Sequence, residues 1–336
     1  MRPLELFATL WPTFPHFSRF ASDPRLAGIR LNSAMVEASE INSAFAEAGG
    51  SVPLWFDVKG RQMRIASVRD DPTRLDCELN HPIRVETPVV VLFKGGEDSA
   101  VLERVEDGGR RLIFRGGPAF AVKPGESIHI RHPSLEVGGP IFTDAEREKI
   151  ALVRAAGLRR YFLSYVEGRR DVEEFLELVG PDAEVMLKIE SPRGLAYVER
   201  EFRKTPNLTL VAARGDLFVE VDRPHDIIPA LRTIIAKDPE ACVGSRILLS
   251  VVQEPLPADL RGALQWIAEE RPDAAEISRI LMRVLHRPVP SCADLCELAW
   301  LTDIGYRRLL LCDELCLKGD LLGTAVNIFD EFRRAM

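Results

Sequence analysis

Charged side chains stand at the ends of short apolar stretches in this chain. Lys188 and Glu190 end the stretch Glu184–Glu190, and Asp216 follows the stretch Leu208–Ala213. Lys188 and Glu190 are two residues apart, so on a strand they point to the same side. Carboxylate oxygens are ligands that Mg²⁺ prefers, and such an ion takes its other ligands from water and substrate. The sequence therefore predicts a Mg²⁺ (or Mn²⁺) site at Glu190 and Asp216, with the Lys188 ammonium beside it to stabilise an oxyanion.

Polar residues recur at the ends of further apolar stretches. They are Arg30 and Asn32, Asp57 and Lys59, Ser164, Arg214 and Gly215 next to Asp216, and Ser245. Charges at one strand end often form an ion pair that only closes the edge of a sheet. Their coincidence on six successive strand ends favours a site instead. We expect Arg30, Lys188 and Arg64 to balance the carboxylates and to face a small anionic metabolite.

The stretches that carry these residues alternate with amphipathic segments. The expected strands are Leu4–Trp11, Ala27–Ser33, Val52–Val58, Arg160–Val166, Glu184–Glu190, Leu208–Ala213, Ala241–Arg246 and Arg307–Glu314. The expected helices include Val36–Ala48, Asp171–Val179, Pro192–Lys204, His225–Lys237 and Leu321–Arg334. Nearly continuous apolar strands are typical of a sheet covered on both faces. Eight β/α alternations predict an α/β fold, a (β/α)8 TIM barrel whose strand ends converge on one mouth. A doubly wound sheet is the alternative, but no glycine-rich phosphate-binding turn follows the first strand.

Two insertions interrupt the alternation. Residues 65–140 are rich in Gly, Pro and β-branched residues, which predicts a small β-domain that can cover the site as a lid. Its expected strands are Ile83–Phe93, Ser99–Glu106, Arg111–Phe114 and Ser127–Ile130. The barrel would then comprise residues 1–64 and 141–336, with a helix beginning at Thr143. Within it, residues 258–287 predict a helical insertion of two amphipathic helices broken at Arg271-Pro272.

Composition limits the classes of function. The 336 residues are 46% hydrophobic and carry a net charge of −7, which excludes a disordered chain and argues against a broad nucleic-acid surface. No stretch approaches the ~18 uncharged residues of a membrane span. The six cysteines form no CxxC or zinc pattern, and we expect the two pairs spaced by four, Cys292/Cys296 and Cys312/Cys316, to be buried thiols. Scattered thiols without a signal-like start predict a cytoplasmic protein. We expect the histidines to be structural or at the surface, and the tryptophans to be packed.

At these residues the sequence resembles the pyruvate kinase family. The most specific motifs are Leu187-Lys188-Ile189-Glu190-Ser191 and Val211-Ala212-Ala213-Arg214-Gly215-Asp216-Leu217. Supporting motifs are Ile29-Arg30-Leu31-Asn32, Asp57-Val58-Lys59-Gly60 with Arg64, Phe162-Leu163-Ser164 and Gly244-Ser245-Arg246-Ile247-Leu248. The resemblance covers the family's barrel and lid, and we expect no counterpart of the family's C-terminal domain.

The resemblance implies roles for the metal-side residues. Glu190 and Asp216 would hold the divalent cation that binds the enolpyruvate oxygens, and Lys188 would lie against the transferring phosphoryl group. Arg30 and Ser164 would contact the phosphate. Backbone N–H groups of Ala213, Gly215 and Asp216 would bind the carboxylate. Asn32, Asp57, Lys59, Arg64 and Arg214 join them as substrate-binding positions.

Ser245 stands where the family has a threonine that helps to protonate the enolate. The alternative position is Ser278, in a similar five-residue motif. Ser245 follows Asp216 by 29 residues, which allows one helix and one strand, whereas Ser278 follows it by 62. The sequence therefore favours Ser245.

The nucleotide side departs from the family. Trp11-Pro12 replace a small glycine-containing turn, and Ala34 and Met35 replace a serine and a histidine, which removes one ligand of the family's monovalent cation. Use of K⁺ therefore stays open. The resemblance implies phosphoryl transfer between phosphoenolpyruvate and a nucleoside diphosphate, with ADP or ATP as candidate partners. The alternatives are a metal-dependent lyase, aldolase or decarboxylase acting on pyruvate enolate without a nucleotide, and a non-catalytic metabolite-binding relative. A homo-oligomer also stays open.

Overall fold

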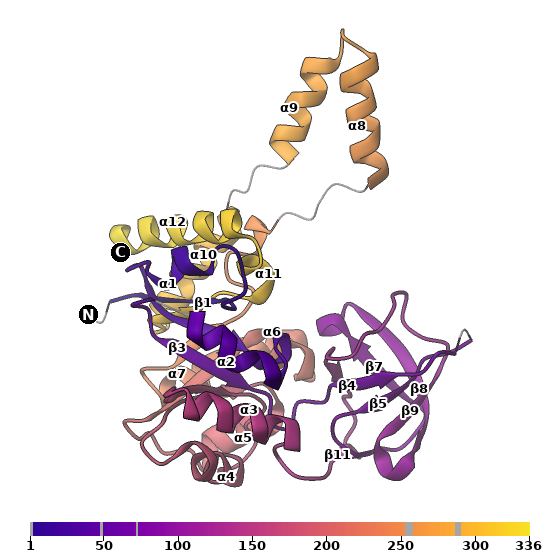
Figure 1. Cartoon of the computed structure of the whole chain (residues 1–336), viewed down its shortest axis with the longest axis vertical. Helices are drawn as coiled ribbons and strands as arrows, with labels where there is room; N and C mark the ends of the chain where they lie inside the picture. The colour runs from indigo at the N-terminus through magenta and orange to yellow at the C-terminus, as the bar shows by residue number, and fades with distance from the viewer. Residues whose placement is uncertain (1–2, 48–49, 72, 253–257, 286–289) are drawn as a thin grey trace.

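A computed structural model describes residues 3–47, 50–71, 73–252, 258–285 and 290–336 of the chain (Figure 1). Eight parallel strands close into a barrel in the order β1-β16-β15-β14-β13-β12-β3-β2. They are β1 (Glu5–Thr9), β2 (Leu26–Asn32), β3 (Leu54–Val58), β12 (Arg160–Leu163), β13 (Glu184–Ile189), β14 (Leu208–Ala213), β15 (Cys242–Gly244) and β16 (Arg308–Leu310). The predicted TIM barrel with an inserted β-domain is confirmed, and each predicted apolar stretch supplies one barrel strand.

Helices follow most of the barrel strands. They are α1 (Phe17–Ala21), α2 (Ala38–Glu47), α3 (Asp144–Ala155), α4 (Arg169–Val179), α5 (Pro192–Arg200), α6 (Arg214–Glu220), α7 (Ile227–Lys237), α10 (Cys292–Asp303), α11 (Asp313–Cys316) and α12 (Gly319–Ala335). The Thr143 hydroxyl accepts from the backbone N–H of Glu146, whose carboxylate accepts from Thr143 in return, so a capping box begins α3 as predicted. None of the described helices is long and apolar enough to cross a membrane.

Alternation along the strands divides the barrel into an inner and an outer face. The inner face carries an apolar cluster of Phe7, Trp55, Phe162, Met186, Val211, Cys242 and Leu310. This cluster leaves little room at Gly28, where a Cβ atom would lie 2.6 Å from the Phe7 ring. The residues between the inward ones pack outward against the helices. Residues beyond the cluster at the carboxyl ends of the same strands, such as Lys188 after Met186, therefore face the barrel mouth.

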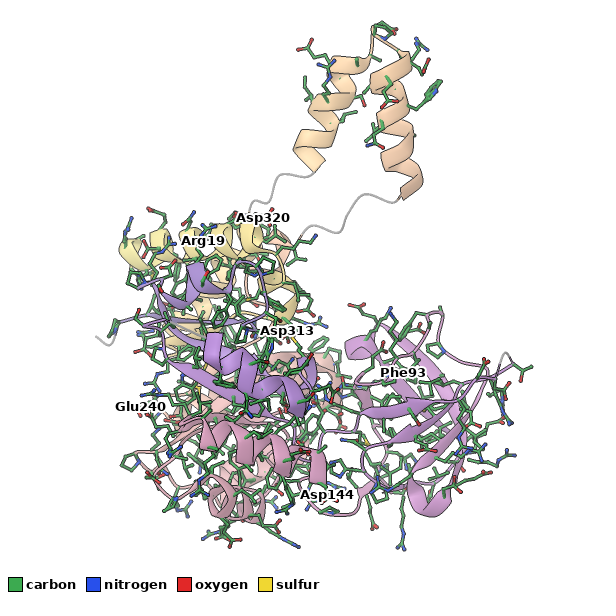
Figure 2. The ribbon with its side chains drawn as sticks, in the orientation of Figure 1. Arg19, Phe93, Asp144, Glu240, Asp313 and Asp320 are labelled. Carbon is green, nitrogen blue, oxygen red and sulfur yellow. The ribbon has the colours of Figure 1, made fainter. Side chains whose placement is uncertain are left out.

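The lid is a separate antiparallel sheet with its own core, and Phe93 lies within it (Figure 2). Its strand order is β10-β7-β8-β9-β5-β4. The strands are β4 (Ile65–Val68), β5 (Asp76–Leu79), β7 (Val89–Phe93), β8 (Asp98–Glu106), β9 (Arg111–Arg115) and β10 (Ile128–His129), and β6 (Ile83–Arg84) pairs separately with β11 (Glu136–Val137). The single predicted strand Ile83–Phe93 was wrong. It divides into β6 and β7 because Pro88 has no N–H to donate to a strand ladder.

The helical insertion forms a hairpin of α8 (Ala258–Glu270) and α9 (Ala275–Leu285), broken at the predicted proline. Its predicted last residues, 286–287, lie outside the described residues. Figure 1 shows the hairpin, in orange, projecting away from the barrel.

Three further expectations were wrong. The predicted strand Arg307–Glu314 is only β16, because Asp313 and Glu314 begin α11, where acidic side chains favour the helix N-terminus. Cys292 and Cys296 are exposed on α10, whereas Cys312 and Cys316 are buried as predicted. Trp266 is 58% exposed on α8 rather than packed, since the projecting hairpin offers it no core.

Candidate active site

Asp57 is the centre of the charged layer at the barrel mouth. Its fully buried carboxylate accepts hydrogen bonds from Arg30 Nε at 2.8 Å, Lys59 Nζ at 2.7 Å and Ser164 Oγ at 3.2 Å. Although burial opposes it, the charges of Arg30, Lys188 and Lys59 hold the pKa of Asp57 well below its usual range. Asp57 therefore stays ionised and fixes the positions of Arg30 and Lys59.

Lys188 lies between Asp57 and Glu190, one of the two predicted metal ligands. Its ammonium lies 2.8 Å from Glu190 Oε1, donates to Ser164 Oγ at 2.9 Å and lies 3.8 Å from Asp57 Oδ2. Burial alone would lower the pKa of Lys188, but the Asp57 and Glu190 carboxylates raise it. Lys188 is therefore charged, buried and directed at the mouth from β13.

Glu190 and Asp216 form a close carboxyl pair. Glu190 Oε2 accepts from the backbone N–H of Tyr165 at 2.7 Å, and the Glu190 and Asp216 carboxyls are near enough for each to shift the pKa of the other. Burial raises the pKa of Glu190 to about 7 against the pull of Lys188, with Asp216 adding to the rise. Buried Glu190 Oε1 accepts no well-aligned hydrogen bond in the described part of the chain. A hard divalent cation fits this pair because it would supply the positive charge that the two carboxylates lack.

The carboxyl pair would need further ligands from outside the chain. Within the described ranges, no three His, Cys, Asp or Glu side chains gather closely enough to hold a metal ion. Mg²⁺ commonly keeps waters and substrate oxygens in its coordination shell, so a two-carboxylate site matches its chemistry.

Ser245 lies beside this pair, immediately after β15. Its backbone has a left-handed φ of 40°, which is strained for a residue other than glycine, and its Oγ accepts from the Gly215 N–H at 2.9 Å. With Lys188, Glu190, Asp216 and others it lines a cavity of about 130 Å³. Within the described residues the Ser245 hydroxyl donates to no side chain or backbone group, so its proton can face a molecule in that cavity.

Two of the predicted anion-binding groups have other partners. The Gly215 N–H is engaged by Ser245, and Arg214 is turned to the barrel wall. Arg214 donates to the Ser245 carbonyl oxygen at 2.7 Å and to Glu297 Oε1 at 2.5 Å. Arg214 therefore positions the Ser245 turn, while Ala213 lines the cavity directly.

The remaining predicted residues surround a larger cavity between the mouth and the lid. This cavity has a volume of about 510 Å³. Its basic residues are Arg30, Lys59, Arg64, Lys94, Lys188 and Arg246. Asn32 also lines it and donates to Asp313 Oδ1 at 3.2 Å, while Arg64 donates to Gln62 Oε1 at 2.9 Å and to the Gly125 carbonyl. The excess of positive charge suits an anionic ligand.

His129 is a site residue that sequence reasoning missed. It comes from the lid strand β10, is fully buried, and holds Nδ1 2.6 Å from Glu220 Oε1 and 3.1 Å from the Tyr165 hydroxyl. Its Nε2 lies 3.5 Å from Asp216 Oδ1. The sequence offered no ligand spacing around His129, because its partners lie on the barrel and meet it only when the lid docks.

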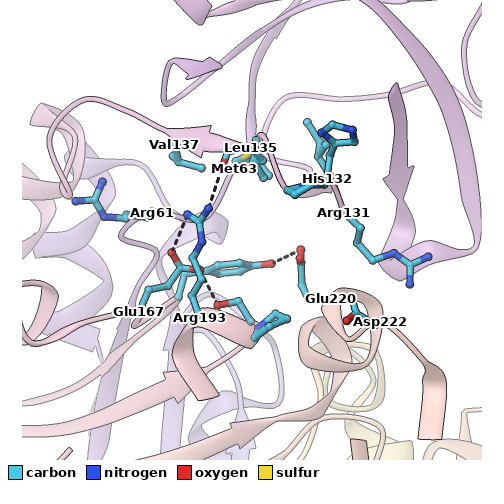
Figure 3. Close-up of a pocket in the computed structure, with 15 residues that line it drawn as sticks. Arg61, Met63, Arg131, His132, Leu135, Val137, Glu167, Arg193, Glu220 and Asp222 are labelled. Atoms are coloured by element: carbon cyan, nitrogen blue, oxygen red, sulfur yellow. Dashed lines mark hydrogen bonds and ion pairs between the residues drawn. The ribbon is translucent and has the colours of Figure 1, made fainter. Parts of the chain in front are cut away.

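A second cavity, which Tyr165 helps to line, lies at the root of the lid (Figure 3). It has a volume of about 420 Å³. Arg193 donates to the Leu135 carbonyl at 2.8 Å and lies 4.0 Å from Glu167. Tyr165 and Glu220 line this cavity, and they also contact the site residues Glu190 and His129.

Comparison with known proteins accords with this geometry, although no family model matches the chain. The pyruvate kinase of Methylorubrum extorquens is 26% identical over 237 residues, which are 63% of this chain and 48% of the relative. That of Agrobacterium vitis is 33% identical over 175 residues, which are 50% and 34%. That of Encephalitozoon cuniculi is 32% identical over 132 residues, which are 39% and 29%. The chain is pyruvate-kinase-like. Each of these matches spans less than half of the relative's length.

Proposed function

We propose that this pyruvate-kinase-like chain binds phosphoenolpyruvate or pyruvate with a divalent cation and transfers a phosphoryl group between phosphoenolpyruvate and a nucleoside diphosphate. The observation that carries the proposal is the fully buried Glu190 carboxyl and the Lys188 ammonium at the barrel mouth, with the half-buried Asp216 carboxyl nearby. Burying such charges costs free energy, and a bound cation and anion would complete their neutralisation.

Each residue would act on a stated part of the substrate. Glu190 and Asp216 would hold the cation, which would neutralise the enolate and carboxylate oxygens when bound. Lys188 would face the transferring phosphoryl group and then the enolate oxygen, and Arg30 would bind the phosphate. The Ser245 hydroxyl would deliver a proton toward the enolate carbon.

The lid would exclude water from this chemistry. His129 reaches from the lid to Asp216 and Glu220. The lid therefore contacts one of the predicted metal ligands, Asp216, directly. Lys94 and Arg246 line the mouth cavity from the lid and from the loop after β15, where the phosphates of a nucleotide would lie. Exclusion of water strengthens these electrostatic interactions.

A second candidate function keeps the enolate and omits the nucleotide. The observation that favours it is Trp11, whose bulky side chain is fully buried where the family has a small turn near the nucleotide. Met35 stands 38% exposed in place of the family's histidine. The reaction would then be a metal-dependent lyase, aldolase or decarboxylase step on pyruvate enolate.

Two assays separate the candidates. Purified chain with Mg²⁺ and phosphoenolpyruvate is assayed for pyruvate with and without ADP, and pyruvate methyl protons are followed for exchange into deuterated water. ADP-dependent loss of phosphoenolpyruvate supports phosphoryl transfer, and proton exchange alone supports the nucleotide-free function. Failure of both, in protein that binds neither Mg²⁺ nor oxalate, would contradict the proposed site.

A further inference from the structure

Cys292 and Cys296 form an exposed thiol pair outside the candidate active site. They stand four residues apart on α10, so both lie on one face of the helix, and their Sγ atoms are 3.8 Å apart. The shared hydrogen bond raises the pKa of Cys296, so this thiol keeps its proton beside the Cys292 sulfur. Each sulfur is therefore open to solvent and has a second sulfur in contact with it.

The other four cysteines of the chain offer an internal comparison. Cys77, Cys242, Cys312 and Cys316 are all buried. Burial raises the pKa of Cys77, Cys242 and Cys312 to about 12. The thiolate is the reactive form of cysteine, and it must be reached from solvent. Of the six cysteines, the pair on α10 is therefore the one placed to react.

A disulfide between these two sulfurs would change the shape of the start of α10. Residues four apart in a helix have Cα atoms about 6 Å apart, within the ~4.4–6.8 Å that disulfides span. Their Cβ atoms are ~5–6 Å apart, whereas a disulfide needs ~3.5–4.5 Å. The bond can therefore form, but the helix between the two cysteines must tighten to make it.

Two polar contacts tie this part of α10 to the loop after β15. Asp294, between the two cysteines, accepts from the Ser250 hydroxyl. Glu297, directly after the pair, accepts from Arg214 at 2.5 Å, and Arg214 donates to the Ser245 carbonyl oxygen at 2.7 Å. A tightening between the cysteines therefore acts on the loop that carries Ser245, whichever end of the turn moves.

We propose that a hydroperoxide converts Cys292 and Cys296 to a reversible intrahelical disulfide, which displaces the Ser245 loop. One thiolate attacks the hydroperoxide, so that an S–O bond forms and the O–O bond breaks, and the departing alkoxide becomes an alcohol with the proton that the thiol lost. The second thiol attacks the sulfenic acid, so that the S–S bond forms, the S–O bond breaks and water leaves. The two sulfurs lose two electrons and the hydroperoxide gains them. A dithiol reductant reverses the change by thiol–disulfide exchange.

Peptide mass spectrometry of the full chain, treated with a small excess of hydrogen peroxide, tests the disulfide. The expected result is the loss of two hydrogen atoms from the peptide that holds both cysteines, reversed by dithiothreitol, with the four buried thiols unchanged. Cys296→Ser is the matched variant. It should form no disulfide and should carry at Cys292 a sulfenic acid that dimedone traps. A pair that stays reduced, passes to sulfinic acid or links two chains would overturn the proposal.

Hydrogen exchange tests the displacement of the loop without an activity assay. We expect the oxidised wild-type chain to exchange its amides faster at residues 245–251, and the treated Cys296→Ser chain to match the reduced one. A disulfide that leaves exchange in this loop unchanged would contradict the coupling.

The effect on turnover rests on the proposed function, whereas the disulfide and the exchange do not. Oxidation of the wild-type chain should lower turnover about tenfold or more, because the Ser245 hydroxyl is misplaced, and reduction should restore it. Cys296→Ser should keep its turnover under the same treatment. Turnover that survives the disulfide would refute the link to Ser245. A chain with no turnover in either state would count against the proposed function, and the mass and exchange measurements would still decide this inference.

Discussion

At the scale of single residues, the site depends on charges that would be unstable if buried alone. Asp57 holds Arg30 and Lys59 in place, and Lys188 lies between Asp57 and Glu190. Removing one member leaves its partners without compensation, which costs more than a surface pair would. The charge of Lys188, the space at Gly215 and the protonation of Lys59 can each be tested.

Replacing Lys188 should remove most of the activity. Lys188→Met keeps the length of the side chain but removes the ammonium that faces the oxyanion, so we expect kcat to fall roughly 10²–10³-fold. Steady-state kinetics with phosphoenolpyruvate, Mg²⁺ and ADP measures the loss. Lys237→Met, the same change on the exposed surface of α7, is the control. Full turnover by the Lys188 variant would show that the site is assigned wrongly.

Gly215 should tolerate no side chain. A Cβ atom there would lie 2.7 Å from Ser245 Oγ, so Gly215→Ala should displace the Ser245 hydroxyl and lower turnover at least tenfold. Gly262→Ala in α8 meets no atom within 4 Å and should raise stability by roughly 0.4–1 kcal/mol. Kinetics and thermal melting of both variants measure the difference. Equal behaviour of the two alanine variants would rule out this role for Gly215.

Anion binding should weaken as the pH rises past neutrality. Burial lowers the pKa of Lys59 to about 7, with Arg30 and Lys188 adding to the shift and Asp57 opposing it. Lys59 is therefore charged below that pH and neutral above it, and one linked proton changes affinity up to about tenfold per pH unit. Calorimetric titration with oxalate in the absence of Mg²⁺ from pH 6 to 8.5 measures the effect, because ionisation of Glu190, whose pKa is also about 7, would strengthen metal binding over the same range. Lys59→Arg should flatten the profile, and an unchanged slope would refute the assignment.

At the scale of elements, the barrel and the lid contribute different parts of the site. β13 carries Lys188, with Glu190 directly after it, on the rigid barrel wall, whereas β10 carries His129 on a domain with a separate core. The contact of His129 with Asp216 and Glu220 is therefore formed only when the two domains dock.

Lid docking should depend on His129. His129→Ala removes the contacts with Asp216 and Glu220 but leaves the lid core of residues such as Phe93 and Phe114 intact. We expect faster amide exchange in β10 and α6 with the other lid strands unaffected, together with a rise in KM. Mass-spectrometric hydrogen exchange measures this. His132→Ala is the control, because His132 hydrogen-bonds its neighbour Ser134 within the lid. Unchanged exchange in β10 would exclude a docking role.

At the scale of the whole molecule, a chain of net charge −7 encloses a mouth cavity lined by six basic residues. Four acidic residues, Glu97, Asp216, Asp313 and Glu314, line the same cavity, so its lining keeps a small excess of positive charge although the chain as a whole is acidic. A ligand that binds only this folded arrangement must stabilise it.

Mg²⁺ with oxalate should therefore raise the melting temperature. Binding at about 100 times the dissociation constant adds roughly 2.7 kcal/mol of stability, or several degrees for a chain of this size. Differential scanning calorimetry with each component alone and together measures the shift. Asp216→Asn should abolish it, while Asp303→Asn at the end of α10 should not. A shift retained by the Asp216 variant would place the ion elsewhere.

The sequence by itself determined the barrel strands and the residues at their ends. Val, Ile and Leu runs of strand length are a local signal, and the motifs around Lys188 and Asp216 are contiguous, so both can be recognised without knowing what they contact. The predicted strand ends were wrong where a single residue disfavours a strand, as Pro88 does in the lid and Asp313 does after β16. Ser245 was chosen from chain spacing, and it lies beside Gly215.

Only the tertiary structure decided which of these residues meet. His129 contacts Asp216 across 87 residues of chain, and Arg214 turns to Ser245 instead of the cavity. The same holds for the hairpin, where Ser278 faces inward and Trp266 outward. Hydrophobic periodicity predicts that one face of a strand or helix is buried. Which residues of other elements cover that face is decided by how distant parts of the chain pack together.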